Sequence, residues 1–119
     1  MDAGGYGGAG DYFELTEIMS ELEREVDALR RAGCQLAENE SEYRQALAIK
    51  ILNERAKGTP VTIISDVCRG DPDIAELKLL RDSAEVNYKA SLEAINVRKL
   101  RARVISAQID REWTRPSNM

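Results

Sequence analysis

A repeat with alternating steps of four and three residues runs from Leu15 to Leu47. Such a heptad repeat keeps one side of an α-helix apolar and is typical of helices that pair along their length. No proline interrupts the segment, and Gly58 is suited to the residue that follows a helix end. The pattern predicts one helix over residues 11–56. Its repeat positions are Leu15, Met19, Leu22, Val26, Leu29, Gly33, Leu36, Glu40, Tyr43 and Leu47.

A second long helix is predicted over residues 72–113. Asp71 can cap its first turn, and Pro72 suits the first helical position, where no backbone N–H is needed. The next proline is Pro116, so nothing breaks the helix before that point. Residues 1–10 hold five glycines and are expected to form a flexible tail, because such a segment has little to bury. Residues 116–119 are expected to be a frayed C-terminus.

The tip that joins the two helices spans residues 57–71. Thr59 followed by Pro60 suits the start of a short helix, and Gly70 suits its end. The β-branched run from Val61 to Ile64 leaves a short extended segment as the alternative. The predicted fold is therefore all-α: a single coiled-coil-like hairpin domain over residues 11–115, with antiparallel helices and a short helical element at its tip.

Packing and charge favour an antiparallel alignment of the two helices. The alignment that best matches large with small side chains places Tyr43 against Tyr88, Ile18 against Trp113, and Gly33 opposite Arg98. The same alignment sets the acidic start of the first helix beside the basic end of the last one. Each exposed ion pair contributes little, but the pattern as a whole selects the antiparallel form.

The last helix carries a second apolar stripe on the side opposite its pairing face. A helix that is apolar on two sides is buried on two sides. We therefore expect a homodimer or a higher oligomer that forms a helical bundle through this outer stripe. Its residues are Val86, Ala90, Val97, Leu100, Val104 and Ala107.

Residue types for catalysis or metal binding are sparse. The chain contains no histidine, and Cys34 and Cys68 lack metal-like spacing. No glycine-rich phosphate loop follows a strand-like segment. We expect no enzymatic activity, no metal and no cofactor, and both cysteines buried and unpaired. No apolar run approaches the roughly 20 residues that span a membrane, and no signal peptide is evident, so a cytoplasmic protein is expected.

The tip holds more polar and apolar residues than a simple turn requires. It is the predicted surface for an unidentified protein partner, through Arg55, Lys57, Ser65, Asp66, Arg69, Asp71 and Lys78. One alternative is nucleic-acid binding through the basic cluster Arg98, Lys99, Arg101 and Arg103. Another is an oligomer that binds a small ligand or sequesters nucleotides.

Several short stretches of the chain resemble a known group of proteins. They are the segment from Tyr43 to Ala48, the tip from Gly58 to Asp66, Arg69-Gly70-Asp71, residues 75–78, residues 91–96 and the closing Arg111-Glu112-Trp113. These stretches resemble small, uncharacterised helical proteins that are encoded by phages and prophages of Gram-positive bacteria. The genes of those proteins lie near replication and recombination genes. The resemblance implies an accessory protein in the host cytoplasm. It would act as an adaptor or inhibitor of replication, recombination or host-defence machinery, an anti-CRISPR-like role included.

Overall fold

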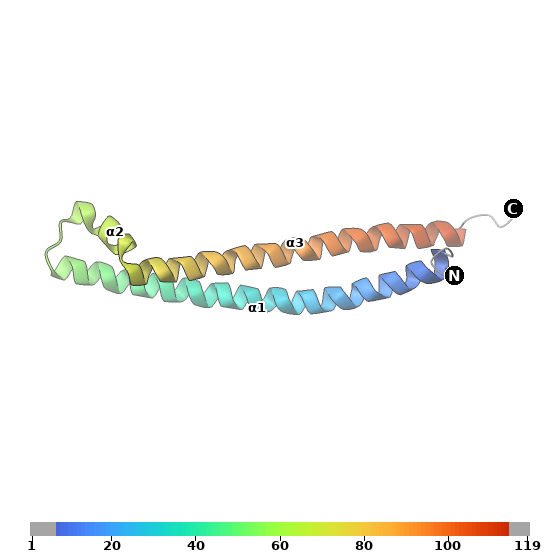
Figure 1. The fold of residues 1–119 in the computed structure, drawn as a ribbon, viewed down its shortest axis with the longest axis horizontal. Helices are drawn as coiled ribbons and strands as arrows, with labels where there is room; N and C mark the ends of the chain where they lie inside the picture. The colour runs from blue at the N-terminus through green and yellow to red at the C-terminus, as the bar shows by residue number, and fades with distance from the viewer. Residues whose placement is uncertain (1–6, 115–119) are drawn as a thin grey trace. The chain divides into compact units, whose positions relative to one another are not determined.

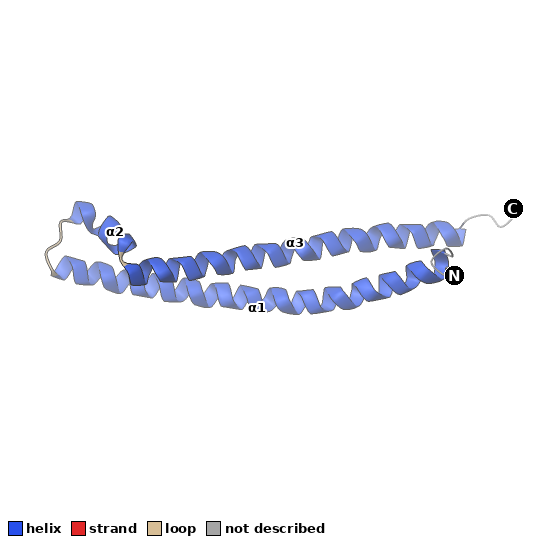
Figure 2. Cartoon of the chain, viewed as in Figure 1, coloured by secondary structure: helices blue, strands red, loops and turns tan. Residues whose placement is uncertain are grey.

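The described part of the chain, residues 7–114, consists of three helices and no strand in the computed structural model (Figures 1 and 2). Helix α1 spans Gly7–Ala56, α2 spans Val61–Gly70 and α3 spans Pro72–Thr114. Side-chain contacts join α1 and α3 in antiparallel order. The predicted all-α hairpin with a short helical element at its tip is confirmed.

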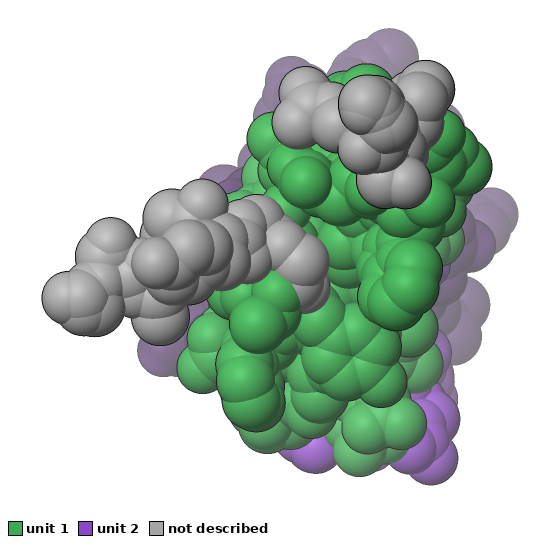
Figure 3. Space-filling model, turned by 90° about the vertical axis from the view of Figure 1, so that its right-hand side faces the viewer, with its two compact units in different colours: residues 1–29, 91–119 green, residues 30–90 purple. Residues whose placement is uncertain are grey.

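The chain divides into two compact units, which are coloured separately in Figure 3. Unit 1 comprises residues 1–29 and 91–119, and unit 2 comprises residues 30–90. Each unit takes one part of α1 and one part of α3, because contacts across a hairpin join only residues at the same level. The prediction of a single domain over residues 11–115 stays a prediction beside these two compact units.

Helix α1 begins at Gly7, so residues 7–10 of the predicted tail are helical. The rest of that tail and the predicted frayed residues 116–119 lie outside the described residues. The helix ends at Ala56, as predicted, and Gly58 follows with a φ of 85°. The N–H of Gly58 donates to the carbonyl of Arg55 and the N–H of Thr59 to that of Glu54. This pair of bonds satisfies carbonyls that the helix end leaves open.

The tip residues form the helix α2, so the extended alternative is wrong. The predicted cap is wrong in detail: Pro60 stands at the capping position, and no side chain caps α2. The Thr59 hydroxyl instead donates to the Glu54 carboxylate at 2.8 Å. Helix α2 buries Ile64 and Cys68 and turns its remaining residues outward.

Asp71 caps α3, as predicted. Its carboxylate Oδ1 accepts hydrogen bonds from the backbone N–H groups of Asp73, at 2.9 Å, and Ile74, at 3.2 Å. Asp71 also forms an ion pair with Lys50 of α1.

The predicted alignment of the two long helices is wrong in unit 2. A Cβ built on Gly33 would lie 3.3 Å from the Tyr88 ring, and Tyr88 is ten residues before Arg98, the predicted neighbour. Tyr43 contacts Arg81 rather than Tyr88. Because Lys50 pairs with Asp71, the last two turns of α1 extend past the start of α3. Helix α2 occupies that level (Figure 1), whereas the prediction had centred the turn on the middle of the tip.

The alignment also differs in unit 1. Arg98 bonds to Glu25 and Glu21, and Trp113 is exposed rather than packed on Ile18. The predicted meeting of acidic α1 with basic α3 is nevertheless confirmed here. The apolar residues that are buried among the described residues are Ile18, Ile95 and Ile105 in unit 1 and Tyr43, Ile64, Cys68, Ile74 and Ala84 in unit 2.

Candidate interaction surfaces

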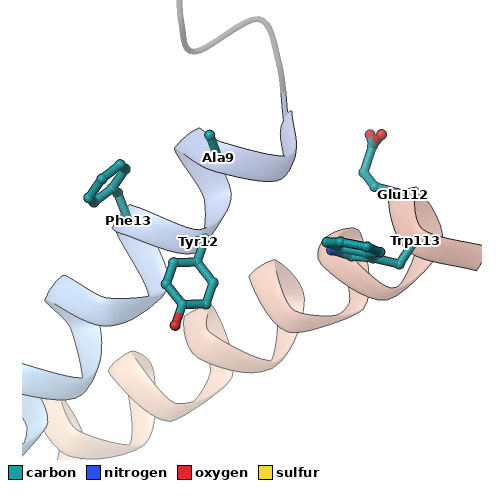
Figure 4. Close-up of a pocket in the computed structure, with 5 residues that line it drawn as sticks. All are labelled: Ala9, Tyr12, Phe13, Glu112 and Trp113. Carbon is teal, nitrogen blue, oxygen red and sulfur yellow. The ribbon is translucent and has the colours of Figure 1, made fainter.

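Among the described residues of unit 1, three large aromatic side chains lie on the surface. Tyr12, Phe13 and Trp113 are 64%, 72% and 81% exposed. Together with Ala9 and Glu112 they line an open hollow of about 540 Å³. In Figure 4 the Trp113 ring points from α3 toward α1, and Phe13 points away from α3. We call this set of five residues the aromatic end. This surface was not predicted from the sequence, because Trp113 was expected to pack against Ile18.

One side of unit 1 is an apolar groove of about 780 Å³ between α1 and α3. The apolar residues that line it on α1 follow one another at steps of three and four residues, and so do the residues that line it on α3. Three charged side chains stand at its rim. The lining residues are Met19, Leu22, Glu23, Val26, Asp27, Leu29, Leu92, Ile95 and Lys99.

Ion pairs link α1 and α3 elsewhere in unit 1. The Arg98 guanidinium donates from Nε to Glu25 at 2.8 Å and lies 3.0 Å from Glu21 through Nη1. Arg101 pairs with Glu14. The carboxylate of Glu25 raises the pKa of Arg98, with a further contribution from Glu21. None of these five residues lines the apolar groove.

These ion pairs bear on the nucleic-acid alternative. Arg98 and Arg101 are each bound to carboxylates of α1, which compete with phosphates for their charge. Lys99 and Arg103 are exposed and make no ion pair among residues 7–114. The predicted cluster of four basic residues therefore presents only two unpaired charges.

The outer stripe predicted as the oligomer interface is exposed at all six positions. Val86 and Ala90 belong to unit 2, and the other four residues belong to unit 1. Its use as an interface stays a prediction. The stripe is not the only apolar surface, since Met19 and Val26 in the groove are also about half exposed.

A polar network joins the end of α1 to the start of α3 in unit 2. Glu54 is only 6% exposed and accepts a hydrogen bond from the Thr59 hydroxyl. It also pairs with Lys57 at 3.3 Å and with Lys50 at 3.4 Å. Lys50 reaches Asp71 at 3.3 Å. Three partners thus satisfy the charge of the buried Glu54 carboxylate, and one of them, Lys50, also binds Asp71.

The network shifts the titration of its members. The hydrogen bond from Thr59 and the Lys57 and Lys50 ammonium groups lower the pKa of Glu54. The backbone N–H of Ile74 lowers the pKa of Asp71, and Lys50 adds to this. The two carboxylates in turn raise the pKa of Lys50.

This network divides the predicted tip surface into two groups. Asp71, Lys57 and Lys78 have structural partners, which are Lys50, Glu54 and Asp82 respectively. The other four predicted residues are exposed, and their side chains form no hydrogen bond or ion pair within the described chain: Arg55, Ser65, Asp66 and Arg69. Their role in partner binding stays a prediction.

The two cysteines differ. Both are unpaired, as predicted, but only Cys68 is buried, and Cys34 is exposed. Among residues 7–114 no cluster of three or more side chains is arranged to hold a metal ion, and no helix there is long and apolar enough to cross a membrane. A comparison of the chain with protein-family models, curated proteins and solved structures found no match.

Proposed function

We propose that the protein is a non-enzymatic adaptor or inhibitor that binds another protein, and that it binds through the aromatic end of unit 1. The observation that carries the proposal is the exposure of Tyr12, Phe13 and Trp113 around one hollow. The whole chain has six aromatic residues, so half of them stand exposed at this one place.

Exposed aromatics of this size favour a partner on energetic grounds. Burying one such side chain contributes about 1.5–3 kcal/mol, and tryptophan and tyrosine are enriched among residues that dominate binding energy. Among the described residues that line the hollow, Glu112 is the one with a charged side chain. A carboxylate there repels phosphates and attracts lysine or arginine. The fitting ligand is therefore an apolar protein segment with an adjacent basic residue, and the aromatic end replaces the tip as the main candidate surface.

The resemblance to helical phage and prophage proteins supports the same class of function. It points to proteins of replication, recombination or host defence as the source of the bound segment. Peptides tiled across such proteins are therefore the appropriate probe.

Binding to such a peptide array tests the proposal. We expect bound peptides to share an apolar residue beside lysine or arginine, and we expect Phe13→Ser to abolish their binding. Leu79→Ser is the matched control, because Leu79 is similarly exposed at 64% but lies in unit 2. Equal loss in both variants, or none in either, would contradict the proposal.

Fluorescence gives an independent readout, because Trp113 is the only tryptophan. Its emission should shift to shorter wavelength as a bound peptide covers the ring. A shift caused by single-stranded oligonucleotide at low salt, and not by any peptide, would replace the proposal with the nucleic-acid alternative.

A further inference from the structure

The groove of unit 1 has the side-chain spacing of a helix-packing surface. Met19, Leu22, Val26 and Leu29 follow one another at steps of three, four and three residues on α1. Leu92, Ile95 and Lys99 follow at steps of three and four on α3. Two rows with this spacing form the holes into which side chains of further helices insert. The hairpin thus presents half of a four-helix packing arrangement.

The rim charges of the groove are opposite in sign on its two walls. Glu23 stands on the α1 wall and Lys99 on the α3 wall. Neither side chain forms an ion pair or hydrogen bond with any residue from 7 to 114. They lie at the same level along unit 1, because Arg98, next to Lys99, bonds to Glu25 and Glu21 on either side of Glu23 in the sequence.

We infer that a second copy of this chain covers the groove, with a two-fold axis parallel to the helices. Such an axis leaves every residue at its own level and sets α1 of one copy against α3 of the other. Glu23 of each copy then faces Lys99 of its partner, so both unpaired charges are matched in a self-complementary contact. All neighbouring helices in the resulting four-helix bundle run antiparallel.

The charge pattern disfavours the other two-fold arrangement. An axis across the helices would place α1 against α1 of the partner copy. The acidic rim of one copy would then meet the acidic rim of the other, and like charges at an interface are unfavourable. The opposite charges of Glu23 and Lys99 on the two walls therefore favour a second copy of the chain as the occupant of the groove. They also favour a two-fold axis parallel to the helices.

The inferred dimer relocates the interface from the outer stripe to the groove. It also sets the aromatic ends of the two copies at the same end of the paired units, because the axis preserves the direction of every helix. Two aromatic ends side by side would bind a partner with two matching segments more tightly than one alone. The inference does not depend on the proposed function, since it concerns a different surface of unit 1.

Light scattering of the full-length protein over a range of concentrations tests the dimer. Val26 in the groove and Val104 in the outer stripe are both 52% exposed and both belong to unit 1. We expect Val26→Glu to raise the dissociation constant of the dimer by at least about 100-fold, because it places two carboxylates in the apolar interface. Val104→Glu should leave it unchanged. Circular dichroism should show equal helix content in both variants.

A monomeric wild-type protein would overturn the inference. So would a dimer that Val104→Glu dissociates and Val26→Glu does not, which would restore the outer stripe as the interface. A shift of only a few-fold in Val26→Glu would also count against the groove.

Cysteine cross-linking tests the direction of the axis. Glu23→Cys and Lys99→Cys are prepared separately with Cys34→Ser, and the buried Cys68 is retained. Under mild oxidation an equimolar mixture should form a disulfide-linked dimer, and each variant alone should not. Cross-linking of Glu23→Cys with itself would overturn the parallel axis.

Charge reversal provides a second test of the same contact. Glu23→Lys should weaken the dimer about tenfold or more, and adding Lys99→Glu should restore most of the affinity. Failure of the second change to restore it would remove the proposed ion pair.

Discussion

The two units of this chain are built from the same pair of helices, but among the described residues only unit 2 has a third helix, α2. In unit 2, α2 closes the end of the hairpin and five apolar side chains are buried, with the network around Glu54 beside them. In the described part of unit 1, three isoleucines are buried, while a groove and three aromatic rings stay open.

The difference indicates a division of roles between the units. A two-helix hairpin has too little interior to cover its apolar residues, and in unit 2 the added helix α2 contributes Ile64 and Cys68 to the buried set. Unit 1 has no such third helix among its described residues. The surfaces left open there carry both proposals, with the aromatic end for another protein and the groove for a second copy.

The largest expected effect concerns the closure of unit 2 by α2. Ile64 and Ile63 are neighbours in α2, at 7% and 44% exposure. We expect Ile64→Ala to lower the free energy of unfolding by about 2–5 kcal/mol. The control variant Ile63→Ala should lower it by less than about 1 kcal/mol. Urea denaturation measures both. Equal losses would show that α2 does not close unit 2, and the contrast with unit 1 would fail.

A smaller effect is expected where α1 and α3 approach closely in unit 2. A larger side chain at Gly33 would meet the Tyr88 ring, so Gly33→Leu should cost about 1–3 kcal/mol. A Cβ on Gly70, by contrast, has no neighbour within 4 Å. Gly70→Ala should be neutral or stabilising by up to about 1 kcal/mol. Thermal unfolding compares the two. A tolerated leucine at residue 33 would contradict the helix alignment described for unit 2.

The smallest effect is a pH dependence confined to unit 2. The pKa values of Glu54 and Asp71 are lowered in the folded chain. In the unfolded chain the pKa values are about 4.3 for Glu54 and about 3.9 for Asp71. Between these values and the lower pKa values of the folded chain, the unfolded chain therefore binds more protons. The two carboxylates therefore stabilise the folded chain fully at a pH above their unfolded-state pKa values. This stabilisation is lost as the pH falls through their folded-state pKa values.

Thermal unfolding at pH 7 and pH 3 measures this effect. Acidification should lower the melting temperature of the wild type more than that of Glu54→Gln, which cannot titrate at this position. Glu85→Gln is the control, because the more exposed Glu85 pairs, among residues 7–114, only with Lys89 of its own helix. It should respond as the wild type does. A wild-type response identical to that of Glu54→Gln would contradict the network.

The elements of the fold could be predicted because their signals are local. The heptad repeat, Gly58 and the Asp71-Pro72 pair depend on residues within a few positions of one another, and the predicted end of α1 and start of α3 lie where the structure has them. The tail was mispredicted at residues 7–10, which continue α1 despite their glycines.

The alignment of the helices depends on contacts between distant residues, and there the prediction was wrong. Matching large with small side chains and acidic with basic ones fits several alignments of α1 with α3 about equally well, because the apolar repeat recurs along the whole helix. The observed alignment pairs Lys50 with Asp71, and α2 lies at the level of the last turns of α1 (Figure 1). The aromatic end was missed for the same reason, since the mistaken alignment placed Trp113 against Ile18.

The concentration dependence of amide hydrogen exchange tests the contrast between the units most directly. Exchange is measured by mass spectrometry at protein concentrations below and above dimer formation, and peptides of residues 15–29 and 91–105 are compared with peptides of residues 40–75. We predict that protection in the first set rises with concentration, because a second copy covers unit 1. Protection in the second set should stay constant. Unchanged protection in both sets, or a rise confined to residues 40–75, would contradict the account.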